Sequence, residues 1–150
     1  GANDSKACAW GAVKVMLALS KISTERRSPL QQRAVEHGVD FLLGVDPLSA
    51  AYPCGYSEKP SANWWKPGFP VFYVTDLLQV AEALAALGRI HDPRAASLLE
   101  WIRGKQDEGG RWALEYDYSG KTWGYFGVKK QPNPWVTLRA LRVLKAAGED

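Results

Sequence analysis

The chain has 150 residues, of which 46% are hydrophobic and 23% are charged, so it can form one globular domain with its own core. Its 19 basic and 16 acidic residues are scattered and leave a net charge of +3, so no basic stripe or tail indicates a nucleic-acid or anionic-membrane partner. The apolar runs are far shorter than the roughly 20 residues of a membrane-spanning helix, so no transmembrane segment and a cytoplasmic domain are expected.

Five helices are predicted in chain order. Helical periodicity marks residues 6–21 and 74–87, and three other helices begin where a capping side chain precedes a proline, at Ser28, Asp92 and Asn133. Three glycines are expected to end these helices in a left-handed conformation: Gly44, Gly104 and Gly148. The predicted helices therefore cover residues 6–21, 30–44, 74–87, 93–104 and 134–147.

The helices differ in how many of their faces are apolar. Residues 30–44 keep one polar face, which is typical of an outer helix, whereas residues 6–21 and 74–87 are apolar on both sides and are expected to lie inside. The last helix sets an apolar face against a polar one, the first made of Val136, Ala140, Leu141 and Leu144 and the second of Arg139, Arg142 and Lys145. Inner and outer helices are thus predicted to alternate.

Two stretches of the chain match at a constant spacing. Phe41-Leu42-x-Gly44 corresponds to Trp101-Ile102-x-Gly104, 60 residues later. Leu84 and Gly88 correspond to Leu144 and Gly148 at the same spacing. Because caps and aromatic residues share this spacing, the pattern indicates a repeated helical hairpin.

The sharpest motif follows the fourth predicted helix. Trp101-Ile102-x-x-x-Gln106-x-x-x-Gly110-x-Trp112 resembles the Gln-Trp repeat of squalene-hopene and oxidosqualene cyclases. In that family the glutamine ties down a helix end and the tryptophan ring stacks beside it, so these residues are expected to be structural. Gly110 permits the turn that returns the Trp112 ring.

The resemblance extends to the starts of two inner helices. The segments 68–78 and 133–141 resemble those of uncharacterised bacterial squalene-cyclase-like proteins. The resemblance implies an all-α fold in the terpenoid cyclase and protein prenyltransferase superfamily, here a partial α/α toroid. In this superfamily the inner helices begin at a central cavity that holds an isoprenoid, which by position implies a lining of Cys8, Trp10, Phe69, Phe72, Tyr73, Asp76 and Trp135.

A Trp-rich segment, residues 63–70, closes a long loop that runs from residue 45. A loop of this length is uncommon in a compact domain unless it covers or lines a site, so Trp64 and Trp65 join the predicted ligand-binding residues. Plain core packing is the alternative role for all of these aromatic side chains.

Catalytic motifs of the superfamily are missing. The Asp-x-Asp-Asp motif of squalene-hopene-type cyclases does not occur, which leaves Asp76 as a weak catalytic candidate that serves equally well as a helix cap. Prenyltransferases hold zinc with Asp, Cys and His; Asp4 and Cys8 echo this only loosely, and His37 and His91 suit surface positions. No metal and no cofactor are expected. Cys8 and Cys54 are expected to be free, largely buried thiols.

Alternating apolar residues after Trp112 predict a small β-hairpin over residues 114–125, with its turn at Ser119-Gly120. Glu115 and Asp117 share its polar face. Paired carboxylates at a toroid mouth serve as acid and base in α/α-toroid glycosidases and lyases, so a carbohydrate-active enzyme is one alternative function.

Residues 1–150 are therefore expected to form a single domain of toroid type. Toroids of this superfamily have more hairpins, so the chain is either part of a longer protein or associates with a second copy to cover its inner helices. The leading hypothesis is binding of an isoprenoid or another apolar small molecule. A non-catalytic helical scaffold for protein partners is the main alternative.

Overall fold

The fold is known from a computed structural model, which describes residues 4–53, 59–118 and 120–149. Its α-helices in this part are α1 (Ala9–Leu19), α2 (Pro29–Leu43), α3 (Leu77–Ala86), α4 (Ala96–Gly104) and α5 (Pro134–Ala146). Short 3-10 turns lie at Thr24–Arg26, Ala62–Trp65 and Pro93–Ala95. The predicted all-α class and the five predicted helices are confirmed. None of the described helices is long and apolar enough to span a bilayer.

The predicted helix starts are confirmed by their caps. Ser28 and Gln31 form a reciprocal capping box at α2, and Asp92 accepts the backbone N–H of Arg94 just before α4. The Asn133 side chain accepts the backbone N–H groups of Trp135 and Val136 at α5. Each cap precedes a proline in the first turn, so the start of each helix is encoded locally.

The predicted glycines do lie at the helix ends, but the left-handed conformation predicted for two of the three is wrong. Gly148 does adopt a positive φ of +85°, but Gly44 has a φ of −71° and remains right-handed. Gly104 is the last residue of α4, and the chain continues with right-handed turns through Lys105. The indole N–H of Trp112 bonds to the carbonyl of Ile102 at 2.7 Å, so α4 ends on a tertiary contact and needs no left-handed cap.

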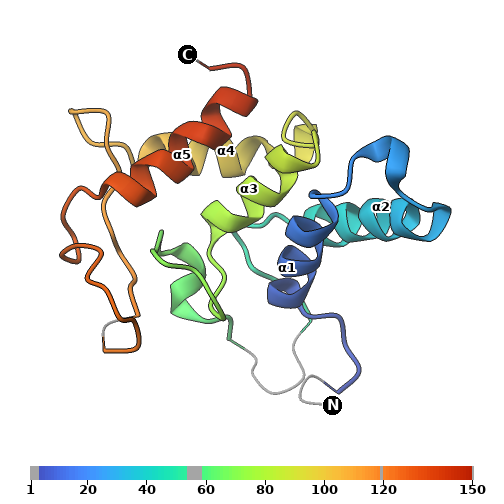
Figure 1. Ribbon diagram of the computed structural model, residues 1–150, viewed down its shortest axis with the longest axis horizontal. Helices are drawn as coiled ribbons and strands as arrows, with labels where there is room; N and C mark the ends of the chain where they lie inside the picture. Colours follow the sequence, from blue (N-terminus) through green and yellow to red (C-terminus); the bar gives the residue numbers. More distant parts are fainter. Residues whose placement is uncertain (1–3, 54–58, 119, 150) are drawn as a thin grey trace.

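The central helix is α3. It packs against α1 on one side and α5 on another, while α2 packs on α1 and α4 packs on α3 (Figure 1). Seven of its ten residues are buried. The prediction that residues 74–87 are covered on both sides is therefore confirmed. The start of α1 and the loops before α3 and α5 lie toward the lower part of the view (Figure 1).

The helices at the two ends of this row are covered less completely than predicted. In α1, Val13 and Met16 are buried, but Val15 on the opposite side is 51% exposed. In α5 the predicted faces are wrong at two positions, because Arg139 is 6% exposed and Leu141 is 47% exposed. Arg139 is turned inward because α3 presents two carboxylates to it.

The predicted β-hairpin is wrong for the described residues. Leu114 exchanges backbone hydrogen bonds with Lys130 and Gln131, at 2.7 and 3.0 Å, instead of with residues 123–125. Tyr116 forms an isolated parallel bridge to Gly68. Long-range pairing on both sides thus replaces the local turn, whose residue Ser119 lies outside the described part.

The residues of the Gln-Trp motif meet at the end of α4. Gln106 and Trp112 form an antiparallel bridge, and Gly110 turns the chain between them with a φ of +74°. The Lys105 ammonium lies 5.1 Å from the centre of the Trp101 ring. The predicted structural role of this segment agrees with the geometry, although the tryptophan indole and not the glutamine amide bonds to the helix end.

Two glycines provide a matched test of this packing. A Cβ at Gly68 would lie 2.8 Å from the backbone oxygen of Tyr116, whereas a Cβ at Gly104 would meet no atom within 4 Å. We expect Gly68→Ala to lower the free energy of unfolding by about 2 to 3 kcal/mol because backbone must move. We expect Gly104→Ala to leave it unchanged or to raise it by up to about 1 kcal/mol. Urea denaturation measures both, and equal losses would contradict the described contact.

Candidate functional site

Asp76 is the hub of a buried polar network at the start of α3. Its Oδ1 accepts the backbone N–H of Gln79 at 2.7 Å, and its Oδ2 accepts that of Gly68 at 2.9 Å. Arg139 donates once to each oxygen, at 3.0 and 3.1 Å. Both oxygens therefore accept two hydrogen bonds each, which is the geometry of an ionised carboxylate. Asp76 is a helix cap and an ion-pair partner, and the structure gives no support to a role as proton donor.

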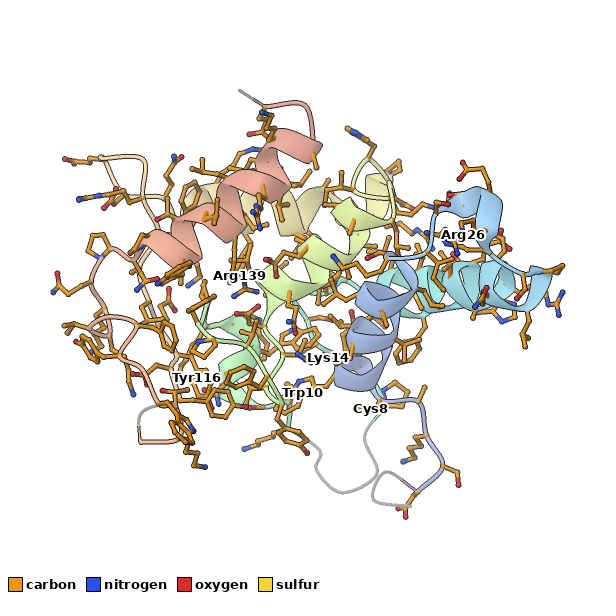
Figure 2. The ribbon with its side chains drawn as sticks, in the orientation of Figure 1. Cys8, Trp10, Lys14, Arg26, Tyr116 and Arg139 are labelled. Atoms are coloured by element: carbon orange, nitrogen blue, oxygen red, sulfur yellow. The ribbon has the colours of Figure 1, made fainter. Side chains whose placement is uncertain are left out.

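Arg139 reaches Asp76 from α5, and Figure 2 shows it between α5 and α3. Its guanidinium also donates to both carboxylate oxygens of Glu82, at 2.9 and 2.7 Å, and to the carbonyl of Gly68 at 2.6 Å. Burial alone lowers the pKa of Arg139, but the Asp76 and Glu82 carboxylates outweigh it and hold the pKa above its ordinary value. The guanidinium stays charged and joins α5, α3 and the loop before α3.

Lys14 adjoins this network from α1. Its ammonium donates to the side-chain oxygen of Gln79 and, at 3.4 Å, to the carbonyl of Val74. Burial lowers the pKa of Lys14 below its ordinary value, although Asp76 opposes the shift. Lys14 thus places a half-buried cation on the side of α1 that faces the loop before α3 (Figure 2).

An open cleft of about 1040 Å³ lies beside Lys14, at the N-terminal end of α1. One wall comes from α1 and the residue before it, a second from the loop after α2, and a third from the loop before α3. Besides Lys14, the lining includes five aromatic residues: Trp10, Tyr52, Trp64, Phe72 and Tyr73. The rings of Trp10 and Tyr73 meet edge to face at 5.6 Å.

Five of the nine residues predicted to bind a ligand line this cleft: Cys8, Trp10, Trp64, Phe72 and Tyr73. Phe72 and Tyr73 are 61% and 76% exposed, so these two rings are open to a ligand. Trp64 is 2% exposed and its indole N–H donates to the carbonyl of Pro47 at 2.9 Å. Trp64 is therefore packed beneath the surface of the cleft and offers almost no exposed area to a ligand.

The other predicted residues lie elsewhere. Trp65 donates its indole N–H to the carbonyl of Leu48 at 2.9 Å and fixes the loop after α2. Phe69 and Trp135 stack on each other with ring centres 5.1 Å apart, and Phe126 packs edge to face against Phe69. They form a separate aromatic cluster at the start of α5. The resemblance to the superfamily implies that all inner helices begin at one cavity. In this structure the cleft is lined from the start of α1 and the loop before α3, and not by Trp135 at the start of α5.

Tyr52 and Lys14 were not predicted as site residues. The Tyr52 hydroxyl donates to the carbonyl of Leu42 at 2.6 Å, and burial raises its pKa above the ordinary value. Lys14 had a signal in the sequence, because it is the one charged residue within a helix that is otherwise apolar. Tyr52 had none, since its contacts depend on how the loop folds back on α2.

The cysteine and metal predictions are partly tested. Cys8 is exposed, so its predicted burial is wrong; it precedes α1, outside the packed core. Cys54 lies outside the described residues. In the described ranges no group of three or more His, Cys, Asp or Glu side chains is placed to hold a metal ion. His37 and His91 are both exposed.

The two carboxylates proposed for sugar chemistry are engaged with lysines. Glu115 pairs with Lys105 at 2.6 Å, and Asp117 pairs with Lys129 at 3.1 Å. The hairpin that would have placed them on a common face is not formed. The structure therefore gives the carbohydrate alternative no support.

Arginine substitutions test whether the buried network holds this site together. We expect Arg139→Met to lower the free energy of unfolding by about 3 to 5 kcal/mol, because it leaves Asp76 buried without its cation. Arg103→Met is the control, since Arg103 pairs with Glu149 on the surface and should lose less than about 1 kcal/mol. Adding Asp76→Asn to Arg139→Met should recover part of the loss. Similar values for the two arginine variants in urea denaturation would contradict the described network.

Comparisons with known proteins bear on family membership. Searches of the sequence against protein-family models and curated proteins, and of the fold against solved structures, find no match. The likeness of residues 101–112 to the Gln-Trp repeat therefore stays a prediction from the sequence. The function of the cleft has to be argued from its own residues, contacts and charges.

Proposed function

We propose that this chain is an α/α-toroid-type domain whose cleft binds an isoprenoid or a similar apolar molecule. The carrying observation is that aromatic residues from the start of α1 and the loop before α3 converge on one open cleft. Its volume of about 1040 Å³ is at the upper end of the roughly 300 to 1,000 Å³ of small-molecule sites. Two of its rings, Phe72 and Tyr73, are exposed without a ligand.

The helix arrangement supports the toroid part of the proposal. In a toroid of helical hairpins, inner helices contact one another and each outer helix covers an inner one. Here α3 contacts α1 and α5, whereas α2 covers α1 and α4 covers α3 (Figure 1). The odd-numbered helices therefore correspond to the inner set and the even-numbered ones to the outer set.

The chemistry of the lining favours binding over proton-transfer catalysis. Aromatic faces suit an apolar chain, and Lys14, which lines the cleft together with Lys59, supplies a positive group that can orient a polar end of the ligand. Asp76, the candidate acid, is held by four hydrogen bonds behind the loop. The proposal is thus a binding site whose specificity depends on apolar contact.

Alanine substitutions at two similarly exposed tyrosines test the ligand proposal. Tyr73 lines the cleft and is 76% exposed, and Tyr125 lies outside the cleft and is 79% exposed. With all-trans-farnesol as the probe, we expect Tyr73→Ala to weaken binding about fivefold to tenfold in calorimetry, because ligand burial against the ring is lost. Tyr125→Ala should bind as the unchanged chain does.

Comparing the two variants distinguishes binding in the cleft from nonspecific binding of farnesol to exposed aromatic residues. Because both tyrosines are exposed, neither substitution should disturb the fold, and circular dichroism checks this. Equal weakening by the two variants would contradict the cleft, as would a failure of the unchanged chain to bind farnesol or its longer homologue geranylgeraniol.

A second candidate, a scaffold that binds protein partners or a second copy, is favoured by one observation. Trp135, Leu138 and Leu141 are 44%, 42% and 47% exposed and share one side of α5. An apolar row on a surface helix is typical of an interface. This side corresponds to the flank that a further hairpin or a second copy would cover.

Self-association is expected to depend on this row. We expect sedimentation to show a concentration-dependent dimer, and Leu141→Glu to shift it to monomer, because a charge would enter the apolar contact. Leu30→Glu is the control, since Leu30 is 69% exposed at the start of α2 and away from the row. A stable monomer that binds no hydrophobic dye would contradict the interface.

A further inference from the structure

The loop before α5 carries an aromatic and basic surface that the ligand cleft does not use. Trp123 is 109% exposed, Tyr125 is 79% exposed and Val128 is 58% exposed. We call residues 120–130 the aromatic loop. Single exposed apolar residues are ordinary, but three large ones within six positions, including a fully exposed tryptophan, mark a contact surface.

This surface is continuous with the mouth of the cleft. Tyr118 lines a groove of about 320 Å³ together with Trp123 and Tyr125. The Tyr118 ring lies 5.7 Å from that of Phe72, which lines the cleft. The exposed rings of the loop before α3 and those of the aromatic loop are therefore neighbours. The backbones of both loops reach the lower part of the view (Figure 1).

Positive charge accompanies these rings. The aromatic loop contains Lys121, Lys129 and Lys130, all exposed, and no acidic residue. Asp117 comes just before the loop, where it pairs with Lys129 at 3.1 Å and lines the groove. The three lysines and Asp117 together give the aromatic loop and its edge a net positive charge.

We propose that the aromatic loop docks on the surface of an anionic lipid bilayer. Trp and Tyr settle at the boundary between headgroups and hydrocarbon because each ring is apolar with a polar edge. Lysines beside them place their charge among anionic headgroups. A protein partner would also accept exposed rings, but the flanking lysines are complementary to an anionic surface.

The proposal differs from ligand binding in the cleft and stands without it. The two share one end of the molecule, so a docked chain would hold the mouth of the cleft close to the hydrocarbon, where apolar molecules concentrate. Docking requires the loop and its charges alone. A chain that binds vesicles and no farnesol would therefore refute the proposed ligand and leave this inference standing.

Vesicle sedimentation without added ligand tests the inference. The full chain is mixed with vesicles of phosphatidylcholine alone and with vesicles in which about a third of the lipid is phosphatidylglycerol. Both mixtures are measured in low and in high salt. We expect binding to the anionic vesicles that falls with salt and is weak for the neutral ones. Trp123→Ala with Tyr125→Ala should weaken this binding about tenfold, because interfacial burial of both rings is lost.

Matched controls localise the effect. Leu30→Ala removes an apolar side chain that is 69% exposed on α2 and should leave binding unchanged. Lys121→Glu should weaken binding more than about fivefold, since each lysine near an anionic surface contributes about this factor, whereas Lys21→Glu at the end of α1 should have little effect. Equal binding to neutral and anionic vesicles, equal losses in the control variants, or no vesicle binding at all would overturn the inference, and the last result would leave the loop as a protein contact.

Discussion

The buried pair of Arg139 and Asp76 determines where the rest of the fold can lie. Desolvating two ions is costly, and the cost is offset only because each carboxylate oxygen and each guanidinium nitrogen has partners. These partners come from α3, α5 and the loop before α3, so one interaction fixes three segments at once. That loop carries Phe72 and Tyr73 into the wall of the cleft. The position of the aromatic wall is thus a consequence of an ion pair behind it.

The same network limits the chemistry of the site. All four hydrogen bonds of Asp76 come from N–H donors, so both of its oxygens act as acceptors in the network and neither donates to the cleft. Two lysines, Lys14 and Lys59, line the cleft. Lys14 donates to the side chain of Gln79, whose backbone N–H donates to Asp76. The polar network therefore holds Lys14 and the loop before α3 in place, and the apolar rings provide the contact area for a ligand.

Local features of the fold were predictable from the sequence, and long-range ones were not. Caps at Ser28, Asp92 and Asn133 depend on neighbouring residues, so helix starts were found correctly. Arg139 was assigned to solvent because periodicity cannot reveal carboxylates that lie 57 and 63 residues away. The hairpin failed for the same reason, since Leu114 and Tyr116 pair with distant segments. Trp10 and Tyr73 were predicted because they lie near the starts of two helices expected to be inner ones. Lys14 had a local signal as the charged residue of an apolar helix, but its contact with Gln79 on α3 did not.

The exposed apolar surface follows from the order of the helices. Among the described helices, α3 packs against α1, α4 and α5, α1 packs against α2 and α3, and α5 packs against α3. Both α1 and α5 keep an exposed apolar flank. The exposed side chains of the two flanks differ in size. On α1 the flank consists of Gly11, Val15 and Ala18. On α5 it consists of the larger Trp135, Leu138 and Leu141. Helices pack by fitting the side-chain ridges of one into the grooves of another, so large exposed side chains on a helix favour a further contact. A row of helices with two such flanks could accept a further hairpin at either one, as the repeated hairpin predicted from the sequence would require.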